Sequence, residues 1–180
     1  MAGRTPALAV QAFVDPLQRA ISCVTDEILS VGGGYHPASP PHLLSLRRGE
    51  PVPLSGNSRL AIRIAQQYRI VEHDGPRGPW KVSSVAYRYA LSDQGGRDIL
   101  AYHWHPWEGM PITWPHLHLD AGARIGREDL TRAHLPTGRV AVEDVIALAI
   151  GELGVRALRA DWRDVLDQSL EAFRLWRTWA

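Results

Sequence analysis

Two segments of alternating apolar and polar residues, joined by a turn-forming run, constrain the fold more than any other feature of this chain. Residues 80–91 alternate so that Tyr87 and Tyr89 share one face of a strand. The run Ser-Asp-Gln-Gly-Gly-Arg follows at residues 92–97, and residues 98–105 alternate again. This pattern predicts an antiparallel hairpin, and with it an antiparallel sheet.

The histidines are concentrated on and after the second of these strands. Five of the eight lie between His103 and His134, and four of the five form two His-x-His pairs. Residues two apart in a strand point to the same face, so each pair presents two imidazoles side by side. Imidazole exchanges protons near neutral pH and is a common metal ligand. If the two strands pair, one surface carries four rings, from His103, His105, His116 and His118.

Helical patterns flank the strand region on both sides. Apolar residues recur at spacings of three to five over residues 1–30, with Thr5 as the cap and Pro16 expected to kink or split the helix. Residues 139–180 carry two apolar helical stripes, the second of them rich in tryptophan. The Gly- and Pro-rich stretch 31–57 predicts an irregular arm.

The order of these segments predicts a single domain, residues 1–180, of the α+β class. Its antiparallel sheet of about four strands falls within residues 58–120 and packs on N- and C-terminal helices. A helix over residues 58–67 competes with the first of these strands. We expect helices to cover one face of the sheet and the histidines to lie on the other.

Composition narrows the choice of function class. The formal net charge of +1 gives no overall electrostatic attraction to nucleic acid or to a membrane, although it is compatible with a local basic patch. The single cysteine, Cys23, excludes an internal disulfide and a zinc site built on several thiolates. No apolar run approaches the roughly 20 residues of a spanning helix, and no secretory signal pattern begins the chain. We therefore expect a cytoplasmic protein that does not associate with membranes.

Metal-independent cleavage of RNA is the first chemistry that the histidines suit. It needs a base for the 2′-hydroxyl, an acid for the leaving oxygen and a cation for the phosphorane oxygens. His116 and His118 are the expected acid–base pair, assisted by His103 and His105, with no cofactor. The expected substrate-binding residues are two arginines and two aromatic residues: Arg139, Arg88, Tyr102 and Trp107.

Other interpretations stay open. In a metal site, the same four histidines are ligands of zinc or iron, and the protein is a hydrolase or an oxygenase. In an interaction module, such as an antitoxin or a complex subunit, the Trp-rich loop and the last helix form the contact surface, and that helix is a candidate homodimer contact. Arg139 also has two interpretations, because residues 134–139 precede a helix. They form either an anion site or a tight turn with Gly138 at positive φ.

Taken in order, residues 87–153 resemble the TumE-type toxins of bacterial toxin–antitoxin systems. The matching motifs are Tyr87-Arg88-Tyr89, Gly95-Gly96, Ile99 to His103, His116-Leu117-His118 and Val142-Glu143-Asp144. The family's Gly-Asp-His-x-His becomes Trp-Pro-His-Leu-His at residues 114–118, and residues 1–57 and the final helix have no counterpart. The resemblance implies a toxin-like ribonuclease that acts on RNA and is restrained by an antitoxin partner.

Overall fold

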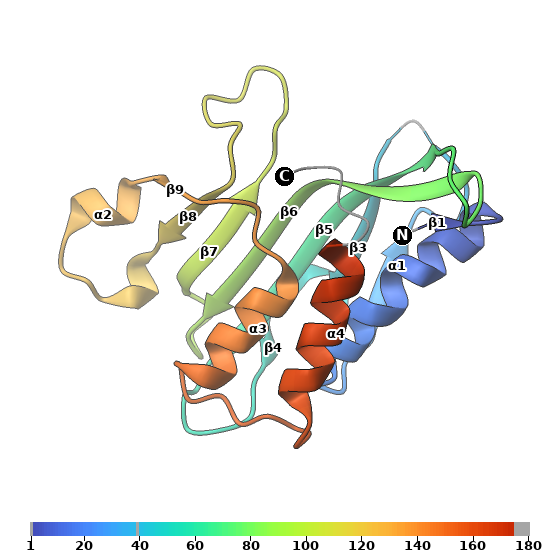
Figure 1. Ribbon diagram of the computed structural model, residues 1–180. Coiled ribbons are helices and arrows are strands. Elements are labelled where there is room, and N and C mark those ends of the chain that lie inside the picture. Colours follow the sequence, from blue (N-terminus) through green and yellow to red (C-terminus); the bar gives the residue numbers. More distant parts are fainter. Residues whose placement is uncertain (1, 39, 175–180) are drawn as a thin grey trace.

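The structure, a computed structural model, describes residues 2–38 and 40–174. It has an α+β fold in which one large antiparallel sheet packs against helices from both ends of the chain (Figure 1). The two longest strands are β5, Ala61–Glu72, and β6, Trp80–Ser92. They pair along their length, with an irregularity between Gln67 and Tyr68. The predicted fold class is confirmed, and the strand is correct for residues 61–67 rather than the competing helix.

The sheet is larger than the sequence predicts, with nine strands in the described part of the chain instead of about four. Its order is β2-β3-β5-β6-β7-β8-β9, while β1 pairs with β6 and β4 pairs with β5. The other strands are β1 (Ala2–Gly3), β2 (Leu29–Gly32), β3 (His42–Leu46), β4 (Val52–Pro53), β7 (Asp98–Trp104), β8 (His116–Leu119) and β9 (Leu135–Pro136).

Residues 31–57 differ most from the sequence-based expectation, because they supply strands and not an irregular arm. β3 lies between β2 and β5, and its Leu44 and Leu46 are buried. The prolines of this stretch lie in the loops around β3 or at the end of β4, so they do not interrupt the ladder of β3. The prolines therefore mark where these strands begin and end, and they do not exclude strands from this stretch.

Three helices pack on one face of the sheet (Figure 1): α1 (Pro6–Ile21), α3 (Val142–Gly151) and α4 (Trp162–Arg174). Thr5 caps α1, since its Oγ accepts a hydrogen bond from the Leu8 amide at 3.2 Å. Pro16 lies inside α1 without splitting it. Short elements complete the chain: η1 (Arg47–Gly49), η2 (Ala121–Ala123) and α2 (Glu128–Arg132).

None of the helices in the described ranges is long and apolar enough to cross a membrane.

The last six residues of the predicted Trp-rich helix, 175–180, lie outside the described residues, so the expected homodimer contact through this helix stays a prediction.

The hydrophobic core fills the space between the helices and the sheet. Val10 on α1, Ile146 on α3, and Ile62 and Leu91 on the central strands are all fully buried there. Alternate residues of the same strands point the other way, onto a face that none of the three longer helices covers (Figure 1). The two His-x-His pairs lie on this open face.

Truncating Leu91 tests the description of the core. Leu91 is 0% exposed, so Leu91→Ala should lower the free energy of unfolding by about 2–5 kcal/mol, because it removes apolar contacts and leaves a cavity. Chemical denaturation followed by circular dichroism measures the change. Leu8→Ala is the matched control: Leu8 is 48% exposed, and its loss should change the free energy by no more than about 0.5 kcal/mol. Equal losses in the two variants would contradict this core.

Candidate functional site

The structure brings the four predicted histidines together on the open face. β7 and β8 pair with His103 opposite His116 and Ala101 opposite His118. The ring centroid of His118 lies 4.9 Å from that of His103 and 4.9 Å from that of His116. The His105 ring lies 5.7 Å from each of His103 and His116. The two His-x-His pairs therefore form one cluster, as their alternation predicts.

A fifth histidine, His134, joins the cluster, and the sequence-based site did not include it. His134 directly precedes β9, which pairs with β8. Its ring centroid lies 4.4 Å from that of His118 and 5.0 Å from that of His116. The sequence carries no local signal for this contact, because the contact depends on how residues 120–133 return the chain to the sheet. We call the five residues the histidine cluster.

His116 is the buried member of the cluster, with 1% of its surface exposed. Its Nδ1 lies 2.8 Å from the Trp114 carbonyl oxygen, which can only accept, so Nδ1 carries the proton. The neutral ring therefore has its lone pair on Nε2, ready for a proton or a metal ion. A backbone carbonyl contact of this kind commonly fixes the tautomer of a metal-binding histidine.

An ion-pair network meets the cluster at His103. Arg88 Nε donates a hydrogen bond to His103 Nε2 at 3.1 Å, and the same guanidinium forms an ion pair with Asp98. Arg63 also pairs with Asp98, at 3.1 Å. Since His103 Nε2 accepts, the neutral His103 ring carries its proton on Nδ1. The network also places a guanidinium charge beside the cluster.

Burial keeps much of the cluster neutral. It is the main reason that the pKa of His103 falls to about 3, and the adjacent Arg88 charge lowers that pKa further. Burial, followed by repulsion from neighbouring histidines, also lowers the pKa of His105 and of His118. Neutral imidazoles have the lone pair that a metal ion needs. They are poor general acids, because imidazolium is the form that gives up a proton readily.

Three of the five histidines lie close enough together that they could share a metal ion. One ring nitrogen from each of His103, His116 and His118 lies within 4.8 Å of the other two. Ligand nitrogens in a tetrahedral zinc site are about 3.4 Å apart, so small side-chain rotations would close the set around an ion. No cysteine, aspartate or glutamate of the described ranges belongs to this group.

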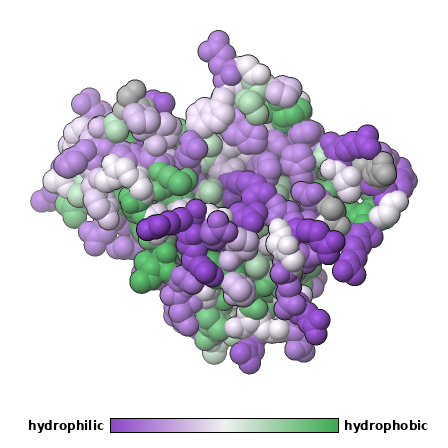
Figure 2. All heavy atoms as spheres, turned by 180° about the vertical axis from the view of Figure 1, so that it is seen from behind, coloured by the Kyte–Doolittle hydropathy of each residue, from purple (hydrophilic) through white to green (hydrophobic). Residues whose placement is uncertain are grey.

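Two of the four predicted substrate-binding residues lie beside the cluster. Arg88 contacts His103 directly. Trp107, in the loop after β7, is 37% exposed and lines a pocket together with Arg88 and His105. Seen from behind, the middle of this face consists mainly of hydrophilic side chains (Figure 2). The cluster therefore borders an open, polar surface with an indole at its edge.

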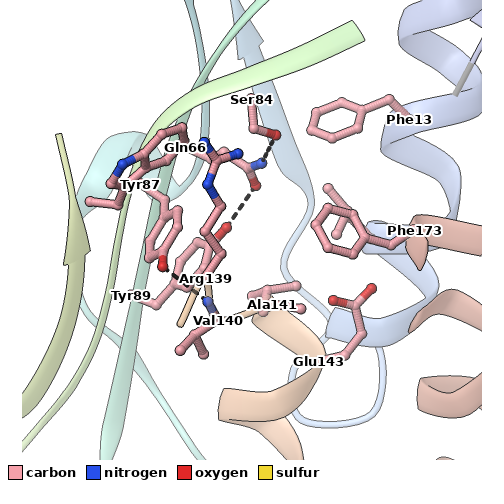
Figure 3. A pocket seen from close by; sticks show the side chains of 13 residues that line it. Phe13, Gln66, Ser84, Tyr87, Tyr89, Arg139, Val140, Ala141, Glu143 and Phe173 are labelled. Atoms are coloured by element: carbon pink, nitrogen blue, oxygen red, sulfur yellow. Dashed lines mark hydrogen bonds between the residues drawn. The ribbon is translucent and has the colours of Figure 1, made fainter. Parts of the chain in front are cut away.

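The other two predicted residues lie on the helix side of the sheet. Tyr102 is partly buried near α3, which raises the pKa of its hydroxyl. The Arg139 guanidinium stacks 3.5 Å from the centre of the Trp104 ring. Arg139 lines a pocket between the sheet and the helices (Figure 3), with no histidine in its walls. Gly138 is not among the described residues with positive φ, so the predicted tight turn of that type does not form.

The pocket of Figure 3 is part of the polar packing inside the fold. The Gln66 side chain donates to Ser84 Oγ at 2.6 Å and accepts from the Tyr89 hydroxyl at 2.9 Å. The buried Glu143 of α3 accepts a hydrogen bond from Ser169 Oγ at 2.5 Å, and burial raises the pKa of its carboxyl group. These contacts tie two strands together and tie α3 to α4, away from the histidine cluster.

No family model, curated protein or solved structure matches the chain. The resemblance of residues 87–153 to TumE-type toxins stays a prediction, and so do the partners that it implies.

Metal-free protein should lose stability as the pH falls. His103 has a pKa of about 3 in the folded state and about 6.5 in the unfolded chain, so between these values the unfolded chain binds more protons. The free energy of unfolding therefore decreases as the pH falls from about 6.5 towards 3. Thermal unfolding in the presence of a chelator measures the effect as a falling Tm.

Replacement of His103 isolates its contribution. His103→Gln should show a Tm that falls less steeply with pH than in the wild type, by a few degrees, since roughly 1 kcal/mol corresponds to about 2–4 °C in a protein of this size. The control His36→Gln removes an exposed imidazole outside the cluster and should keep the wild-type slope. Identical slopes in all three proteins would show that His103 is not held neutral.

Proposed function

We propose that the histidine cluster binds a divalent transition metal ion, zinc foremost, and that the protein is a metal-dependent hydrolase. The observation that supports this most strongly is the set of His103, His116 and His118, with one nitrogen each within 4.8 Å of the others. Three protein ligands and one position open to water are the ligand arrangement of hydrolytic zinc sites. The cluster borders an exposed face, which leaves that fourth position accessible.

The protonation states favour the same function. The lowered pKa of His103 and of His118 leaves both rings neutral at physiological pH, as metal ligands must be. The Trp114 carbonyl fixes the His116 tautomer with Nε2 unprotonated. The two remaining members of the cluster would be candidate proton acceptors beside an ion, since the ring centroid of His105 lies 5.7 Å from that of His103 and the ring centroid of His134 lies 4.4 Å from that of His118.

The ligand set favours a hydrolase over an oxygenase. Non-haem iron oxygenases use two histidines and one carboxylate, and the group found here in the described ranges contains no carboxylate. A zinc ion lowers the pKa of a bound water to about 7 and so supplies a hydroxide nucleophile. Arg88 adds a cation that would stabilise negative charge in the transition state.

Metal analysis tests this proposal directly. Protein equilibrated with zinc and then dialysed should retain about one ion per chain, as mass spectrometry of the elements would show. His118→Ala should lose the ion and keep its circular dichroism spectrum, because His118 is only partly buried. His36→Ala, outside the cluster, should bind zinc like the wild type. A wild-type protein that retains no zinc, or a His118→Ala variant that retains it fully, would refute the metal site.

A metal-independent ribonuclease is the second candidate, and the contact of Arg88 with His103 favours it. This guanidinium is the cation that a phosphorane requires, and the resemblance to TumE-type toxins supports RNA as the substrate and an antitoxin as the partner. His116 and His118 would then be the acid–base pair. The phosphate would have to raise the lowered pKa of His118 on binding, before this ring could act as the acid.

Chelation separates the two candidates. We expect RNA cleavage by the purified protein to stop when a zinc chelator is added and to return when zinc is restored, because the nucleophile depends on the ion. Gel analysis of a labelled RNA measures this. The double variant His116→Ala/His118→Ala should be inactive on either mechanism, and His36→Gln should stay active. Cleavage that persists after complete metal removal would support the metal-independent ribonuclease.

A further inference from the structure

We propose that the groove beside the histidine cluster binds a phosphate ester that carries a flat aromatic or heterocyclic group. Arg88 would hold the phosphoryl group, and the ring would lie against Trp107. This assignment of a substrate class rests on the proposed function, because the ion bound by the cluster supplies the second contact to the phosphoryl group.

The groove follows from the pairing of neighbouring strands. Two adjacent rows of paired residues cross the open face, Leu43–Gln67–Ala86 and Ala65–Arg88–His103–His116. A pocket of about 150 Å³ is lined by the first row and by Ala65 and Arg88 of the second, and its remaining lining residues are Tyr87, Trp104, His105 and Trp107. A cavity of about 150 Å³ accommodates benzene, so the pocket is large enough for a single ring. The second row leads from this pocket directly into the cluster.

The shape and chemistry of the groove suit a flat apolar group. Ala65 and Ala86 end at Cβ and so form a shallow floor between larger side chains. Leu43, on β3, and Trp107, in the loop after β7, line the same pocket and are 41% and 37% exposed. A planar ring held there would cover apolar surface of both residues and could stack on the indole.

Metal binding would release Arg88 for an anion. A neutral imidazole has a single lone pair, and once a metal ion takes it the other ring nitrogen carries a proton. The His103 ring then has no lone pair left to accept the hydrogen bond that Arg88 Nε donates to its Nε2 at 3.1 Å. Arg88, still paired with Asp98, would then offer its donors to an anion beside the ion.

The position of Arg88 favours a phosphate ester over a carboxylate. A phosphate monoester has three unsubstituted oxygens, enough to contact the ion with one and the guanidinium fork with two. A carboxylate has two oxygens and would have to divide them between the ion and the fork. The ester group of the phosphate extends from the same centre, and the adjoining pocket accepts it.

Arg88→Met should change two affinities in opposite directions. Zinc should bind more tightly, because a nearby cation and a competing hydrogen bond are removed. Inorganic phosphate should bind the zinc-loaded protein about tenfold more weakly, because the guanidinium fork is lost. Titration calorimetry measures both, and Arg69→Met, which removes an exposed arginine of β5, should change neither. If Arg88→Met does not fold, Arg88→Lys, which keeps the charge but lacks the fork, should also weaken phosphate binding.

Phenyl phosphate tests the ring site. It should bind the zinc-loaded wild type about tenfold more tightly than inorganic phosphate, through contact with Trp107. Trp107→Ala should abolish this advantage and leave the affinity for inorganic phosphate unchanged. Met110→Ala is the matched control and should keep the advantage, because Met110 is 40% exposed on the same loop but does not line the pocket.

The outcomes distinguish the two proposals. If the wild type binds zinc but phenyl phosphate has no advantage, or if Trp107→Ala retains the advantage, the groove does not bind the ring, while the metal site stands. If Arg88→Met binds inorganic phosphate as the wild type does, Arg88 does not hold the phosphoryl group. If the wild type binds no zinc, the proposed function fails, and the assignment of the groove fails with it.

Discussion

The row of Arg88, His103 and His116 depends on the register of the ladder formed by β6, β7 and β8. This register sets Arg88 opposite His103 and His103 opposite His116, so that three strands place their polar side chains in one row. A slip by one residue would turn each histidine towards the helices and each leucine of β8 towards solvent. The core on the other face opposes such a slip, because Tyr89 and Leu91 of β6 are buried there. Burial on one face therefore holds the reactive groups in place on the other.

Ion pairs on the open face neutralise its most buried carboxylate, that of Asp98. The Asp98 side chain is only 8% exposed, and two guanidinium groups, of Arg63 and Arg88, neutralise it. Arg88 in turn satisfies one nitrogen of His103, and the Trp114 carbonyl satisfies one nitrogen of His116. Buried polar groups need such partners, since an unpaired one costs roughly 1–3 kcal/mol. These partners hold both rings in place.

The sequence predicts those parts of the structure whose cause is local. The hairpin of β6 and β7 and the shared face of the two His-x-His pairs follow from alternation and a strong turn, which involve neighbouring residues only. β3 was missed, because the prolines around it suggested a loop and only its pairing between two distant strands makes it regular. His134 was missed for a similar reason, since its contact with His118 requires β9 to pair with β8. Arg139 follows His134 closely in sequence but lies on the other face of the sheet, because the chain passes to the helix side between β9 and α3 (Figure 1).

The contact between Arg88 and His103 is where the two candidate chemistries diverge. A metal ion and a guanidinium compete for the single lone pair of the neutral His103 ring, so the hydrogen bond from Arg88 and a bond from His103 to an ion exclude each other. If acid–base chemistry is the function, this contact is productive as it stands, because the cation is already beside the imidazole that it assists. If a metal ion is the centre, the contact is a resting arrangement that the ion replaces, and the released guanidinium gains a role in anion binding. In both cases Arg88 lies at the boundary between the cluster and the groove, on the face of the sheet opposite the core.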